Sequence, residues 1–143
     1  MMLSPDTAQL SQIFSHAAAP AFLLGAVAGF TSILHGRLVS LLERIRTLNE
    51  IDDSEDKRHK LKADLPRLRI RVKLLSGAIY LALCAAICTT LLLVVSFIAA
   101  FFGFRHEPGA AVMFLLAVLL LAASLIRFAR EIHMGVSEAD HFR

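Results

Sequence analysis

The chain alternates between long apolar stretches and shorter charged ones. Residues 7–36, 74–104 and 108–126 form runs of 30, 31 and 19 residues without Asp, Glu, Lys or Arg. A bilayer core about 30 Å thick needs about 20 mostly apolar helical residues, because each residue adds about 1.5 Å. Each run is long enough, so the pattern predicts three transmembrane helices.

A soluble three-helix bundle fits the pattern poorly. Such a bundle would place polar residues at every third or fourth position, and stretches such as LLLVVSFIAAFF lack them. The composition agrees, with 57% hydrophobic and 19% charged residues against roughly 45–50% and about 25% in ordinary soluble domains. We therefore expect a single all-α integral membrane domain.

The charged segment between the first two runs also has helical periodicity. Apolar residues at helical spacing continue the first helix beyond the membrane and resume after an acidic turn. A helical break or kink is expected at Leu65–Pro66, with Asp64 as a possible cap. The prediction is helix 1 at about 7–36 extending to about 48, an antiparallel helical hairpin at 37–73, helix 2 at about 74–104, and helix 3 at about 109–134 with Gly135 as its C-cap.

The distribution of basic residues predicts the orientation. Cytoplasmic loops carry an excess of Lys and Arg, and the segment 37–73 holds 11 of the 15 basic residues together with 7 acids. The hairpin and the C-terminus are therefore expected in the cytoplasm and the N-terminus outside.

Small residues form a stripe along the first helix. On a wheel of about 100° per residue they fall within about 40° of Gly25. In lipid such stripes let helix backbones approach closely, so we expect this face to pack on another helix. The second helix of the same chain is the simpler partner and a neighbouring copy is the alternative. The stripe consists of Ala18, Ala21, Gly25, Gly29, Ser32 and Gly36.

The opposite face of the first helix carries a histidine near its outer end. An ionisable residue in a membrane segment is a candidate functional site, although a histidine bonded at the interface is the plainer interpretation. If several copies assembled around this face, it could line a pore with an apolar gate. The candidate pore or polar residues are Gln12, His16, Pro20, Leu23, Val27 and Thr31.

Four basic residues alternate with apolar ones just before the second run. Anionic headgroups are ready partners for them, although ordinary positive-inside topology also explains their presence. The candidate lipid-contact residues are Arg67, Arg69, Arg71 and Lys73.

The acidic cluster at residues 52–56 lacks the spacing of a calcium loop and is interpreted as a solvated turn. Cys84 and Cys88 lack metal-ligating companions in their run and are interpreted as packing residues.

The sequence has no pattern that indicates catalysis. It lacks a convergent Ser/His/acid set, an HExxH motif, a phosphate loop and an intramembrane carboxylate pair. No cofactor, metal or nucleic acid is expected. Two hypotheses remain: a membrane subunit that self-associates or binds a membrane-protein partner, and a homo-oligomeric pore. The first is favoured, because three helices cannot enclose a pore alone.

The N-terminal LSQIFSHAAAPAFLLGAVAGF, the RLRIRVKLL end of the hairpin and the two further apolar helices resemble a bacterial membrane-protein family, domain of unknown function 2721. The resemblance extends over roughly residues 10–133, and SHAAAP is its most distinctive motif. It implies three membrane helices, and hence the bacterial inner membrane. It implies no activity and no functional residues.

Overall fold

A computed structural model describes residues 7–50, 63–104 and 107–141. These residues form three long helices: α1 (Thr7–Glu50), α3 (Leu65–Phe102) and α4 (Glu107–His141). Each is long and apolar enough to cross a membrane. The prediction of an all-α chain with three long apolar helices is confirmed.

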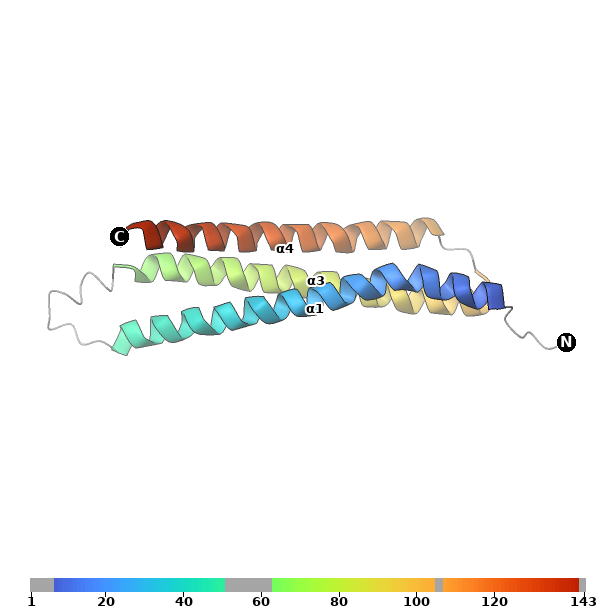
Figure 1. The fold of residues 1–143 in the computed structure, drawn as a ribbon, viewed down its shortest axis with the longest axis horizontal. Coiled ribbons are helices and arrows are strands. Elements are labelled where there is room, and N and C mark those ends of the chain that lie inside the picture. The colour runs from blue at the N-terminus through green and yellow to red at the C-terminus, as the bar shows by residue number, and fades with distance from the viewer. Residues whose placement is uncertain (1–6, 51–62, 105–106, 142–143) are drawn as a thin grey trace.

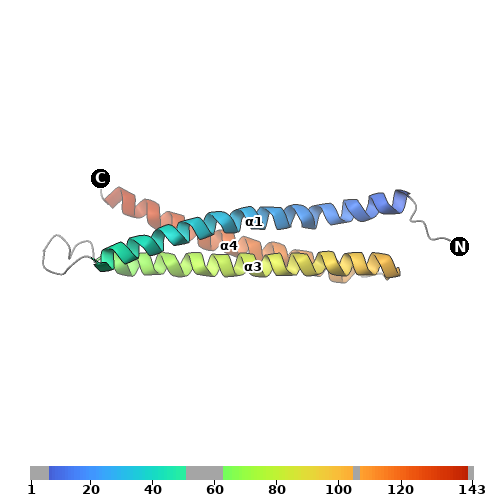
Figure 2. The same cartoon turned by 90° about the horizontal axis from the view of Figure 1, so that it is seen from below.

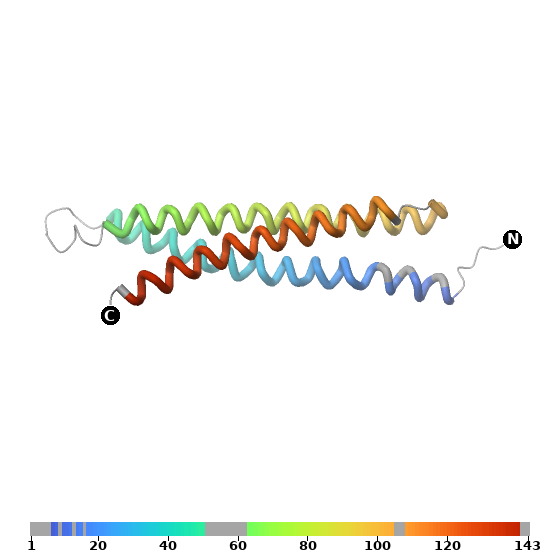
Figure 3. Tube along the Cα trace, turned by 90° about the horizontal axis from the view of Figure 1, so that it is seen from above, coloured from blue at the N-terminus to red at the C-terminus, as the bar shows by residue number. Residues whose placement is uncertain are grey.

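The helix α3 is central to the bundle. Both α1 and α4 pack along it, whereas α1 and α4 share a much smaller contact. Figure 1 shows α1 passing obliquely across α3 while α4 lies alongside it, and Figure 2 shows that α4 is inclined to α3. The tube in Figure 3 shows that α1 begins at one end of the bundle and α4 ends at the other, as expected for three successive spans.

The buried positions recur every seven residues. On α1 they are Val27, Leu34, Leu41 and Leu48; α3 presents two such series, and α4 continues the pattern with Ala117, Ser124 and Glu131. A seven-residue repeat on helices with about 3.6 residues per turn is the spacing of left-handed coiled-coil packing. The two α3 series, which let this helix pack on both neighbours, are Leu68, Leu75, Ala82 and Thr89, and Arg71, Ala78, Ala85, Leu92 and Ala99.

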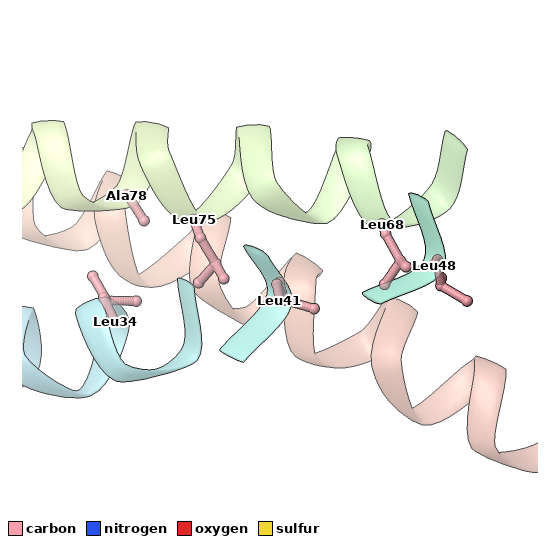
Figure 4. Close-up of a cluster of buried hydrophobic side chains, with 6 residues drawn as sticks. All are labelled: Leu34, Leu41, Leu48, Leu68, Leu75 and Ala78. Atoms are coloured by element: carbon pink, nitrogen blue, oxygen red, sulfur yellow. The ribbon is translucent and has the colours of Figure 1, made fainter. Parts of the chain in front are cut away.

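A leucine cluster joins α1 to the start of α3. The side chains of both helices point toward one another in Figure 4 and form one buried cluster. Part of the cluster lies beyond the apolar runs, where water drives the burial of apolar side chains. The two arms of the predicted hairpin therefore pack on each other where they are described. The cluster consists of Leu34, Leu41, Leu48, Leu68, Leu75 and Ala78.

The ends of α3 follow from its sequence. The helix begins at Leu65 with Pro66 in its first turn, and Asp64 occupies the N-cap position without a side-chain cap bond. This is the break expected at Leu65–Pro66. At the other end Gly103 adopts φ 75°, a left-handed conformation that glycine accepts without steric cost. The acidic cluster at 52–56 lies outside the described residues.

The prediction that α4 ends near Met134, with Gly135 as its cap, was wrong. The helix continues through Gly135 to His141. A Cβ on Gly135 would stand 2.9 Å from Nη2 of Arg71, so the glycine gives the arginine room beside the helix. Ion pairs between Arg71 and α4 support the extra turns.

Candidate functional site

A buried arginine–glutamate pair connects α3 with α4. Arg71 donates hydrogen bonds from Nε and Nη2 to Oε1 of Glu131, at 2.9 and 2.7 Å. Glu131 is completely buried, and Arg71 is 7% exposed. A buried charge is tolerated when it is paired and hydrogen-bonded, which is the case for both side chains.

Two further residues complete a cluster of four charges, which we call the arginine–glutamate cluster (Arg37, Arg71, Glu131 and Glu138). From α1, Arg37 donates from Nε to Oε2 of Glu131 at 3.0 Å and from Nη2 to Oε1 at 3.1 Å. From α4, Glu138 accepts a bond from Nη1 of Arg71 at 3.1 Å. Glu131 therefore receives bonds from both other helices, and the formal charges of the cluster sum to zero.

Aromatic packing supports Arg37 from α4. The guanidinium carbon lies 5.6 Å from the centroid of the Phe128 ring, within the range of a cation–π contact. Phe128 also meets Phe30 of α1 edge to face, with ring centroids 5.4 Å apart. These contacts, together with the Arg37–Glu131 bonds, fix the place where α1 and α4 meet.

The cluster lies at one boundary of the apolar region. Arg37 is the first charged residue after the run on α1, and Glu131 follows the run on α4 by little more than one turn. Arg71 precedes the run on α3 by three residues. The cluster therefore lies where the apolar runs of the three helices end, on the side predicted to be cytoplasmic.

A half-open groove adjoins the cluster between α1 and α3. Its volume is about 330 Å³, at the lower end of the roughly 300–1,000 Å³ of small-molecule sites. Two arginines of the cluster line this groove, Arg37 and Arg71. A third arginine, Arg44, lies about two turns beyond Arg37 on α1. The lining residues are Gly36, Arg37, Ser40, Leu41, Arg44 and Arg71.

The family model described as protein of unknown function DUF2721 matches residues 17–141. The chain belongs to this family. The match includes the apolar run of α1 from Ala17 onward and the whole arginine–glutamate cluster. No curated protein and no solved structure matches the chain.

In this DUF2721 chain the small-residue stripe of α1 faces outward. Ala18, Ala21 and Ser32 are exposed. At Gly25, Gly29 and Gly36 no atom from elsewhere in the described chain lies within 4 Å of where a Cβ would stand. The stripe was expected to pack on the second helix of the same chain. In the structure it does not. The leucine face on the opposite side of α1 packs on α3 instead, because its residues continue into the leucine cluster outside the membrane.

Four small residues of α3 do pack inside the chain. Ala78, Ala82, Ala85 and Thr89 are completely buried. Ser124 of α4 is buried too, and its hydroxyl donates to the carbonyl oxygen of Ala78 at 2.6 Å. The small residues of α3 thus let α1 and α4 approach its backbone closely.

The candidate pore face is partly buried within the DUF2721 chain. Val27 is 2% exposed and Pro20 is also buried, while Leu23 and Thr31 are half-buried. The Thr31 hydroxyl donates to the carbonyl oxygen of Val27 at 2.7 Å. Gln12 is exposed. His16 lies within α1, but its side chain is outside the described part of the chain.

The four basic residues proposed for headgroup contact separate into two groups. Arg67, Arg69 and Lys73 are exposed on α3 and stay candidates for such contact. Arg71 is buried in the arginine–glutamate cluster instead. Its position in the series Arg71–Ala78–Ala85 points it at α4, where Glu131 and Glu138 meet it.

Glu131 and Glu138 were not predicted as partners of Arg71. Both lie beyond the apolar run of α4, where a charged residue needs no special explanation. The series Ala117, Ser124, Glu131 and Glu138, at intervals of seven residues, could have identified them.

In the described residues no group of three or more His, Cys, Asp or Glu could hold a metal ion. Cys84 and Cys88 are half-buried free thiols.

Proposed function

We propose that this protein is a non-catalytic membrane subunit that self-associates through the small-residue stripe of α1. The observation that carries the proposal is the open space over Gly25 and Gly29 on the outward face of α1. Two glycines four residues apart allow two helix backbones to come into close contact in lipid. A second copy of the chain presents the same face, and in a two-fold symmetric dimer the same surface of each copy forms the interface.

The internal packing of α1 supports this choice of face. Val27 and Leu34 are 2% and 0% exposed, so the leucine face is already occupied within the chain. A second helix can therefore meet α1 on the stripe without disturbing the bundle. Lipid chains pack less closely against a flat glycine surface than another helix does, which favours association.

The chemistry of the arginine–glutamate cluster supports a structural role over catalysis. Both oxygens of Glu131 accept bonds from arginines, and Arg71 uses all three of its guanidinium nitrogens. A carboxylate held in this way is poorly suited to exchanging protons with a substrate. The cluster instead joins the three helices at one level.

A pore lined by the His16 face of α1 has less support. Val27 is one of the candidate pore residues, and it is 2% exposed within a single chain. Assembling copies around that face would require α1 to leave α3 first. We therefore keep the pore as the alternative that the same experiment can detect.

The experiment compares small-to-large substitutions on and off the stripe. Ala21→Ile and Gly29→Ile fill the proposed interface. Ala26→Ile lies on α1 about 100° from Gly25, and Ala122→Ile lies on the exposed surface of α4, so both are matched controls. Association is measured by energy transfer between donor- and acceptor-labelled copies in liposomes at several protein-to-lipid ratios.

We expect energy transfer that depends on dilution in lipid for the wild type and for both controls. Ala21→Ile and Gly29→Ile should be monomeric. Wild-type protein that is monomeric at every ratio would overturn the proposal. Oligomers of higher order that conduct ions, with association unchanged by either stripe variant, would favour the pore.

A further inference from the structure

The groove beside the arginine–glutamate cluster has the charge of an anion site. Three arginines line it, and neither Glu131 nor Glu138 does. The two cluster arginines are balanced by the two glutamates, so Arg44 gives the site a formal charge of +1. In the described chain no carboxylate lies within ion-pair distance of Arg44.

Hydrogen-bond donors remain available in the groove. Arg37 uses Nε and Nη2 on Glu131, and its Nη1 has no bond within the described residues. Arg44 and the Ser40 hydroxyl likewise make no hydrogen bond within the described chain. Because Arg37, Ser40 and Arg44 are three, four and seven residues apart, they share one face of α1.

The glutamates behind the groove hold two of its guanidiniums in place. Arg71 is fixed by bonds to two carboxylates, and Arg37 is fixed by Glu131 and by the Phe128 ring. A cationic site whose arginines are already positioned loses less side-chain entropy when an anion binds. Gly36 adds no side chain that would fill the groove beside Arg37.

The level of the groove indicates where its ligand comes from. Arg37 marks the end of the apolar run of α1, so the groove opens at the height of headgroup phosphates. Ile33 lies one turn toward the membrane on the same face and is 58% exposed. Its apolar surface can contact an acyl chain below a headgroup held by the arginines.

We infer that this groove binds the phosphate group of an anionic phospholipid through Arg37, Ser40 and Arg44. Arginine is well suited to phosphate because its planar fork offers paired donors. A headgroup of net charge −1 matches the +1 of the groove. The groove includes Gly36, the last residue of the stripe, and lies about two turns beyond Gly29. Its occupancy is counted per chain.

The test measures lipid binding to the full chain in non-ionic detergent by native mass spectrometry. Phosphatidylglycerol and phosphatidylcholine are titrated onto the wild type and onto Arg44→Gln and Arg46→Gln. Arg46 is the matched control, because it is exposed on the same helix, pairs with Glu50 at 3.4 Å and does not line the groove. Circular dichroism checks that each variant is folded.

We expect one tightly held phosphatidylglycerol per chain, weaker binding of phosphatidylcholine, and an affinity about tenfold lower in Arg44→Gln, since a charge-assisted hydrogen bond contributes roughly 1.5 kcal/mol or more. Arg46→Gln should stay within about twofold of the wild type, since an exposed charge pair contributes little. Equal losses in both variants would reduce the effect to general surface charge and overturn the inference, as would absence of a preference for the anionic lipid.

A second arm separates the two sources of phosphate. Inorganic phosphate is added to the chain loaded with phosphatidylglycerol. Retention of the lipid at millimolar phosphate is expected and supports the lipid as ligand. Complete displacement at that concentration, sensitive to Arg44→Gln, would assign the groove to free phosphate and overturn the lipid assignment.

Discussion

Arg71 places two guanidinium nitrogens on one oxygen of Glu131, at 2.9 and 2.7 Å, where Glu131 is completely buried. Arg37 reaches the same carboxylate from α1. One acidic side chain thus receives hydrogen bonds from both other helices at the level where the apolar region ends.

Replacing Glu131 by glutamine should strongly destabilise the bundle. The substitution leaves the buried guanidinium of Arg71 without its main counter-charge, and breaking a buried pair in this way costs about 3–5 kcal/mol. Unfolding in mixed detergent micelles, followed by circular dichroism, measures the free energy of unfolding. The exposed Glu43→Gln should change it by less than about 0.5 kcal/mol, and equal losses in both variants would contradict a clamping role.

Arg71 and Glu131 should also be energetically coupled. Arg71→Met and Glu131→Met each remove one member of the pair, whereas the double variant removes both and leaves an apolar contact. Because the double variant no longer leaves Arg71 without Glu131 or Glu131 without Arg71, it should lose less stability than the sum of the single variants, by at least about 1 kcal/mol. Additive losses within about 0.3 kcal/mol would show that the pair is not coupled.

Two glycines should respond differently to alanine. A Cβ on Gly135 would press on Nη2 of Arg71, which is held by two carboxylates, while a Cβ on Gly77 would press on the exposed and movable Arg127. Alanine favours a helix over glycine by about 1 kcal/mol. Gly77→Ala should therefore keep most of that gain, and Gly135→Ala should lose it. Unfolding curves of both variants test the difference, and an equal gain would contradict it.

The leucine cluster predicts a contrast between neighbouring residues on α1. Leu41 is 7% exposed and Leu42 is 48% exposed. Leu41→Ala should lower the free energy of unfolding by about 2 kcal/mol or more, because it opens a cavity at the contact with α3. Leu42→Ala should change it by less than about 0.5 kcal/mol. Similar effects in both variants would indicate that α1 is rotated about its axis relative to α3.

The three helices were predictable from the sequence, because uninterrupted apolar runs of this length fit few structures other than membrane-spanning helices. Pro66 also predicted the start of α3, since proline is accepted in a first turn and disfavoured further inside. Gly135 misled the prediction of the end of α4: glycine is typical of a helix cap, and the opposing requirement, room for Arg71, comes from another helix. Such requirements are not visible in the local sequence.

The packing face of α1 could not be chosen from periodicity in the membrane alone. Within the apolar run the glycine stripe and the leucine face are both plausible interfaces. The packing face is determined beyond the apolar run, where Leu41 and Leu48 pack with Leu68, because water favours the burial of these side chains. Because the helix is rigid, the same face continues into the apolar run, where Leu34 and Val27 lie on it.

One face of α1 packs on α3, and we propose that the other face packs on a second copy of the chain. Ser32→Cys, one turn from Gly29 on the stripe, tests it most directly in a chain with Cys84→Ser and Cys88→Ser. Exposed Ala122→Cys on α4 is the control. In oxidised liposomes diluted with lipid, we predict covalent dimers for Ser32→Cys and monomers for Ala122→Cys. Dimers in the control alone, or equal amounts in both, would contradict the claim.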